Sequence, residues 1–122
     1  MELINQSDEG ILKIANPIMD NLMDASTKID FERHIRDFSD RIKEKYTQEE
    51  FQQQCEDYRS KWGVFTEREF IGTTKNKSFV NVYWKQQLSK TDDEFLAILT
   101  LSQNNDRYIV ERAFVDLWQL ER

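Results

Sequence analysis

The spacing of the apolar residues changes once along this 122-residue chain, close to Trp62-Gly63. Before this point apolar residues recur every three or four positions, as on one face of a helix. After it they recur close to every second position, as in a strand. The chain has 3 Gly, 1 Pro, no internal repeat and no stretch with the composition of a linker. The sequence therefore predicts one α+β domain, residues 1–122, with helices first and a sheet after them.

Three helices are expected in the first half. The first begins at Ser7, and we expect it to continue through Pro17 with a kink, because its apolar positions stay in phase across the proline. The second follows Asp30, and its apolar face consists of Phe31, Ile35, Phe38 and Ile42. The third begins at Thr47, where Thr-Gln-Glu-Glu forms a capping box, and ends at Gly63.

The second half predicts four strands, at about residues 64–73, 78–88, 94–103 and 108–120. Short polar connections between successive strands favour an antiparallel meander. A sheet with one wet face should alternate between apolar and polar residues. Here both phases are apolar, since Phe79 and Tyr83 occupy one phase and Val82 and Trp84 the other. We therefore expect the helices to cover one face and a partner or ligand to cover the other.

Composition excludes several classes of protein. The net charge of -6 argues against binding to nucleic acid, which requires a basic surface. No run approaches the roughly 20 apolar residues of a membrane span, and no secretion signal is visible, which predicts a cytoplasmic protein. With 1 Cys and 1 His, the sequence predicts no disulfide, no metal site and no cofactor.

Short motifs add a family resemblance. They are Ile29-Asp30-Phe31-Glu32, Phe38-Ser39, Thr47-Gln48-Glu49-Glu50-Phe51, Trp62-Gly63-Val64-Phe65 and Arg107-Tyr108-Ile109-Val110-Glu111. In this order, over roughly residues 10–118, the chain resembles the nuclear transport factor 2-like superfamily of cone-shaped α+β domains, and within it a small bacterial subgroup of unknown function. The resemblance implies three helices packed on a curved four-stranded antiparallel sheet, a hydrophobic pocket between them, and frequent dimerisation through the sheet. It implies no single activity.

Two residues are weak candidates for catalysis. His34 lies one helical turn from both Asp30 and Asp37, so a carboxylate could orient it as a general base. We favour the simpler interpretation, a histidine on a helix surface. Glu111 and Arg112 are adjacent on a predicted strand, so one of them points inward. An inward Glu111 could act as a base and an inward Arg112 could anchor an anionic ligand, whereas an ion pair at the rim of the sheet is the simpler alternative.

Aromatic residues supply the remaining candidates. We expect Tyr58 and Trp62, on the third helix, to line a ligand pocket together with Arg112, and Cys55 on the same helix face to be a core thiol. The sheet aromatics are expected either at an interface or in the core. The interface candidates are Phe79, Tyr83, Trp84 and Trp118.

The sequence thus favours a non-catalytic, dimeric binding module with a pocket for a small apolar ligand or a peptide. One alternative is an acid–base enzyme of the isomerase or dehydratase type that uses the same pocket. Another is an acidic adaptor or immunity-type protein, whose charge would steer it to a basic partner.

Overall fold

The computed structural model describes residues 2–117. The helices come first: the single 3-10 turn η1 (Leu3–Asn5), then α1 (Asp8–Lys28), α2 (Phe31–Ile35), α3 (Asp40–Lys45) and α4 (Gln48–Trp62). Four strands follow, β1 (Phe65–Lys75), β2 (Val80–Leu88), β3 (Phe95–Asn104) and β4 (Arg107–Leu117). The expected α+β class is confirmed. Trp118, one of the interface candidates, lies outside the described residues.

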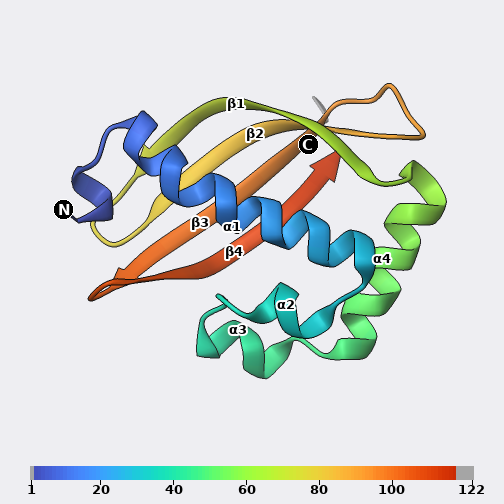
Figure 1. The fold of residues 1–122 in the computed structure, drawn as a ribbon, viewed down its shortest axis with the longest axis horizontal. Coiled ribbons are helices and arrows are strands. Elements are labelled where there is room, and N and C mark those ends of the chain that lie inside the picture. Colours follow the sequence, from blue (N-terminus) through green and yellow to red (C-terminus); the bar gives the residue numbers. More distant parts are fainter. Residues whose placement is uncertain (1, 118–122) are drawn as a thin grey trace.

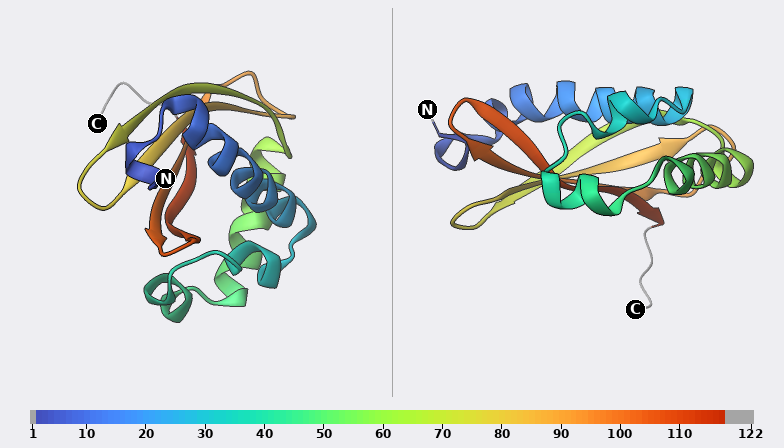
Figure 2. Two further views of the ribbon diagram at one scale, coloured as in Figure 1. Left: turned by 60° about the vertical axis from the view of Figure 1, so that its left-hand side comes forward. Right: turned by 90° about the horizontal axis from the view of Figure 1, so that it is seen from below.

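The strands form one antiparallel sheet in the order β1-β2-β3-β4, so the predicted meander is confirmed. Figure 1 shows α1 crossing one face of the twisted sheet, with α2 and α3 beside β4 and with α4 at one end of the sheet. Figure 2 shows from two further sides how α1 and the α3–α4 segment are arranged about the sheet. This arrangement leaves the face of the sheet opposite α1 without a helix.

Local signals explain the bounds of α1. The Ser7 side chain accepts a hydrogen bond from the Gly10 N–H, which satisfies one of the free donors of the first turn. The helix continues through Pro17 as predicted, and this residue lies on its exposed side. It ends where Ile29 adopts a left-handed conformation, with φ of 54°.

The second predicted helix is in fact two short ones. Between them, Phe38 forms a parallel bridge with Val110 on the free edge of β4. The Val110 N–H donates to the Asp37 carbonyl at 2.7 Å, and the Ser39 N–H donates to the Val110 carbonyl at 3.0 Å. These bonds satisfy backbone groups that an edge strand would otherwise leave unpaired, and they bury Phe38. The continuous helix that the apolar spacing predicted is therefore wrong.

The third predicted helix, α4, has both of its expected ends. Thr47 Oγ1 accepts from the Glu50 N–H at 3.1 Å, and Glu50 Oε1 accepts from the Thr47 N–H at 3.2 Å, which is the predicted capping box. The helix stops at Gly63, whose φ of 88° favours glycine. A Cβ at this position would also lie 2.1 Å from Ser89 Oγ.

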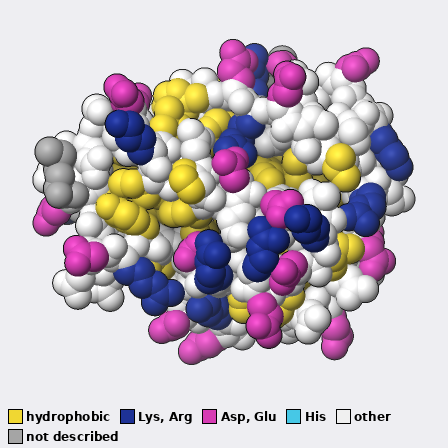
Figure 3. All heavy atoms as spheres, in the orientation of Figure 1, with side chains coloured by type: hydrophobic (Ala, Val, Ile, Leu, Met, Phe, Trp, Pro, Cys, Tyr) yellow, Lys and Arg dark blue, Asp and Glu magenta, His cyan; other side chains and the backbone are white. Residues whose placement is uncertain are grey.

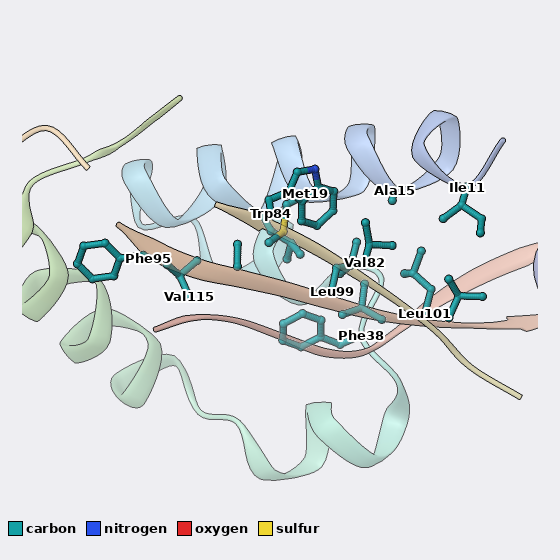
Figure 4. Close-up of a cluster of buried hydrophobic side chains, with 14 of the residues drawn as sticks. Ile11, Ala15, Met19, Phe38, Val82, Trp84, Phe95, Leu99, Leu101 and Val115 are labelled. Carbon is teal, nitrogen blue, oxygen red and sulfur yellow. The ribbon is translucent and has the colours of Figure 1, made fainter. Parts of the chain in front are cut away.

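The core lies between α1 and the sheet. Figure 4 shows Ile11, Ala15 and Met19 of α1 facing the side chains of β2 and β3. Trp84 points toward α1 and is only 2% exposed. The prediction that Trp84 lies at an interface is therefore wrong. Because both alternating sets of residues in β2 are apolar, their spacing did not show which set faces the helices.

The opposite face of the sheet carries a second apolar row. Tyr83, Ile98 and Phe114 lie side by side across β2, β3 and β4. Phe114 is 39% exposed, and Ile71 on β1, beside β2, is 49% exposed. Phe79, just before β2, is also exposed. The expectation that the helices cover only one apolar face is confirmed.

Candidate functional site

A cavity of about 400 Å³ lies between the C-terminal half of α1, the α2–α3 segment, α4 and β4. Apolar side chains from all of these elements line it. The apolar lining residues are Met19, Leu22, Met23, Phe38, Ile42, Tyr46, Cys55, Tyr58, Val64, Phe65, Ala113, Phe114 and Val115. A cavity of this size, lined in this way, is typical of sites that bind small organic molecules.

His34 forms part of the cavity wall. Its ring lies 4.5 Å from the Phe51 ring, 5.2 Å from the Phe38 ring and 6.0 Å from the Tyr46 ring, measured between centroids. Burial lowers the pKa of His34 to about 4, so the imidazole is neutral at neutral pH. His34 is thus half-buried against three aromatic rings and is not a fully exposed histidine of the helix surface.

No carboxylate orients His34 within the described part of the chain. Asp30 Oδ1 caps α2 by accepting from the Arg33 N–H, and Asp37 pairs with Arg36 at 3.3 Å. His34 Nδ1 is buried and has no hydrogen-bond partner among these residues. The arrangement expected for a general base is therefore absent, and the ring serves mainly as an aromatic wall.

The two aromatic residues predicted for the pocket have different places. Tyr58 lines the cavity, and its hydroxyl donates to the Val115 carbonyl, which ties α4 to β4. Burial raises the pKa of Tyr58, with a smaller contribution from Asp116. Trp62 packs edge-on against Phe95, at 5.0 Å between centroids, and borders a shallow groove on the outer side of α4 instead of the cavity. Because its ring packs against Phe95, Trp62 does not line the cavity for which it was predicted.

Cys55 is a buried residue of the cavity wall, as expected of a core thiol. Burial raises the pKa of its thiol, and the hydrogen bond from Ser26 and the charge of Arg59 offset this only in part. A thiol with a raised pKa is a poor nucleophile at neutral pH.

A β-bulge lies at Glu111, between Val110 and Arg112. In the β3–β4 register Val110 lies opposite Leu101 and Arg112 opposite Thr100, so Glu111 is the extra residue. The Glu111 carboxylate borders the cavity, accepts from Ser102 Oγ at 2.8 Å and pairs with Arg41 of α3 at 3.5 Å. Glu111 thus forms an ion pair, as the simpler alternative predicted, but its partner Arg41 lies on helix α3 and not on a neighbouring strand.

Arg112 also borders the cavity, but its guanidinium has other contacts. Its Nε donates to Thr100 Oγ1 at 3.3 Å, and the group lies 5.5 Å from the centre of the Phe114 ring. Three further basic residues line the cavity but were not predicted from the sequence, namely Arg41, Lys45 and Arg59. Their positions depend on the break between α2 and α3 and on the docking of α4, which local patterns do not reveal.

Within residues 2–117, no helix is long and apolar enough to cross a membrane. The same residues contain no group of three or more His, Cys, Asp or Glu side chains able to hold a metal ion.

The sequence matches no protein-family model and no curated protein. Among solved structures, the fold is similar to that of Bd1075 from Bdellovibrio bacteriovorus, with a TM-score of 0.52 and 10% sequence identity. The match covers 89% of this chain and 41% of that one, so this chain spans less than half the length of its structural neighbour. At this identity the similarity concerns the fold alone.

Proposed function

We propose that this chain is a non-catalytic binding module of the nuclear transport factor 2-like type, which takes a small apolar ligand between its helices and β4. The observation that carries the proposal is the cavity of about 400 Å³ with apolar lining from α1, α3, α4 and β4. Burial of apolar ligand surface in such a site supplies the free energy of binding, at about 25 cal/mol per Å². The family resemblance in the sequence supports the same fold and pocket.

The chemistry of the cavity wall favours binding over catalysis. His34 has a pKa of about 4 and no orienting carboxylate, and a general base works best when its pKa is near the working pH. Cys55 is a thiol with a raised pKa. Glu111 already accepts from Ser102 and pairs with Arg41. The pKa values of His34 and Cys55 and the contacts of Glu111 therefore make these three residues poorly suited to acid–base or nucleophilic catalysis.

The test is a fluorescence titration with N-phenylnaphthylamine, a neutral apolar probe. We expect saturable binding to the wild type and its loss in Ala113→Phe, because the phenyl ring would occupy the cavity. Ile71→Phe adds a similar apolar group on β1 outside the cavity lining and should bind as the wild type does. Absence of probe binding to a folded wild type, or equal binding by all three proteins, would contradict the proposal.

We further propose that the module is a homodimer formed through the face of the sheet opposite α1. The row Tyr83, Ile98 and Phe114 supports this, because it places apolar side chains on that face from β2 to the edge strand β4, where Phe114 is exposed. Charges of both signs border the row, since Lys85 pairs with Glu69 and Glu94 at 3.3 Å each. A self-complementary surface of this kind suits a two-fold axis, where the same patch meets itself.

Sedimentation equilibrium tests the dimer. The wild type should be dimeric at micromolar concentration, and Phe114→Glu should shift it to monomer, because the substitution places like charges opposite each other near the axis. Val64→Glu alters another exposed apolar residue outside the row and should leave the dimer intact. A wild type that stays monomeric throughout the concentration series would refute this part of the proposal.

A further inference from the structure

The charged residues of the cavity lining differ in sign from the protein as a whole. The chain has a net charge of -6, yet the charged residues of the lining comprise four basic ones and one acidic one among the described residues. They are Arg41, Lys45, Arg59, Arg112 and Glu111. A purely apolar ligand gains nothing from cations at this position, so their excess bears on the class of ligand.

Two of these basic residues are already engaged. Arg59 donates to the Thr27 carbonyl and so joins α4 to the end of α1. Arg112 donates to Thr100. These contacts make Arg59 and Arg112 part of the framework of the cavity wall, which leaves Arg41 and Lys45, the two basic residues of α3 that line the cavity.

Arg41 and Lys45 are four residues apart on α3, so they lie on the same side of that helix. Arg41 has one long contact, 3.5 Å to Glu111, and its side chain is 64% exposed. Lys45 has no ion pair or hydrogen bond within the described part of the chain. On the face drawn in Figure 3, Lys and Arg side chains gather over the region of α2 and α3, with acidic side chains between them.

Apolar lining residues lie next to this pair along the chain. Ile42 and Tyr46 each follow one of the two basic residues directly, and both line the cavity. A ligand seated against them would bring a polar end group close to Lys45. Since Glu111 offsets much of the charge of Arg41, Lys45 is the principal free cation of the site.

We propose that the natural ligand is an amphipathic monocarboxylate, whose apolar body fills the cavity and whose carboxylate binds Lys45 with Arg41 beside it. This inference rests on the proposed binding function. It adds the chemical class of the ligand, and the apolar probe described above tests the binding function separately. A charge-assisted contact between ammonium and carboxylate is stronger than one between neutral groups, and it gives selectivity that apolar contacts lack.

Competition against N-phenylnaphthylamine with decanoate and decanol tests the inference, because the two compounds share one alkyl chain and differ in the end group. We expect the wild type to bind decanoate about fivefold to tenfold more tightly than decanol at low ionic strength. In Lys45→Gln this preference should fall to about twofold or less, with the affinity for decanol unchanged. Lys43→Gln makes the same change on the same helix, at a residue outside the cavity lining, and should retain the preference.

The outcomes separate the two proposals. If the wild type binds the probe but shows no preference for decanoate, the carboxylate inference is overturned while the binding function stands. A preference that survives in Lys45→Gln likewise overturns the assignment to Lys45. If neither the probe nor either compound binds to folded protein, both proposals fail together.

Discussion

The helix-facing side of the sheet has two halves that differ in how well they are filled. Under α1, Ile11 and Ala15 pack against Trp84 and Leu99, and all four are at most 2% exposed. Beside β4, the side chains of Ile42, Tyr46, Tyr58 and Ala113 are only partly buried and enclose the cavity. The same sheet thus carries a close-packed core and a binding site.

The difference follows from the covering helices. α1 is one helix of 21 residues, with small residues such as Ala15 where it approaches the sheet. The other half is covered by α2 and α3, of 5 and 6 residues, and by α4 at the end of the sheet. Short helices tied to the β4 edge through Phe38 leave a volume that their side chains do not fill. A break in helical structure therefore creates the site.

The largest expected effect is that of Trp84→Ala. Removal of a fully buried large side chain leaves a cavity in the close-packed half, and we expect the free energy of unfolding to fall by about 3–5 kcal/mol. Met23→Ala, at a partly buried residue of the cavity wall, should cost only about 1–2 kcal/mol. Urea denaturation of both variants measures the difference. Equal losses would mean that the two halves are packed equally well.

A pH-dependent effect of His34 should come next. Its pKa is about 4 in the folded protein and about 6.5 when unfolded, so the unfolded chain binds more protons between these values. Stability from this residue is complete above pH 6.5 and is lost as the pH falls toward 4, by up to about 3 kcal/mol. His34→Phe should remove this part of the pH dependence, as measured by urea denaturation between pH 4 and 7.

The comparison with His34→Phe isolates the histidine, since the carboxylates titrate in both proteins. Parallel pH profiles for the two proteins would show that His34 is not held neutral by the aromatic wall. The cavity would then have a hydrated wall at this point, and the contrast between the two halves would be larger than described.

A smaller effect is expected for Tyr58→Phe. The variant loses the hydrogen bond to the Val115 carbonyl but retains the ring, so the free energy of unfolding should fall by about 1 kcal/mol. Loss of this tie between α4 and β4 should also widen the cavity and weaken probe binding. Thermal unfolding together with the N-phenylnaphthylamine titration measures both. Unchanged values in both assays would show that α4 is held in place by other contacts.

Local signals were enough to predict much of the fold. Ser7 marked the start of α1, the capping box at Thr47 marked α4, and the short polar connections predicted the antiparallel meander. Each of these features depends on residues close together in the sequence. The pocket between helices and sheet was an expectation from the family resemblance and stays a prediction, and Tyr58, which was expected to line it, borders the cavity.

The remaining features depend on contacts between distant residues. The break between α2 and α3 exists because Val110 offers an unpaired strand edge to Asp37 and Ser39, more than 70 positions earlier in the chain. His34 is half-buried because Phe51, on another helix, packs against it. Both phases of β2 are apolar, so the burial of Trp84 was decided by the position of α1 and not by spacing. Sequence patterns carry none of this information.

Methyl NMR of the protein titrated with N-phenylnaphthylamine tests most directly whether one half of the sheet is close-packed and the other half binds the ligand. We expect the signals of Met23 and Ile42, on the cavity wall, to shift on binding, while those of Ile11 and Val82, in the close-packed half, stay in place. Shifts at Ile11 and Val82, or saturable binding without shifts at Met23 and Ile42, would contradict the division of the sheet into a filled half and a binding half.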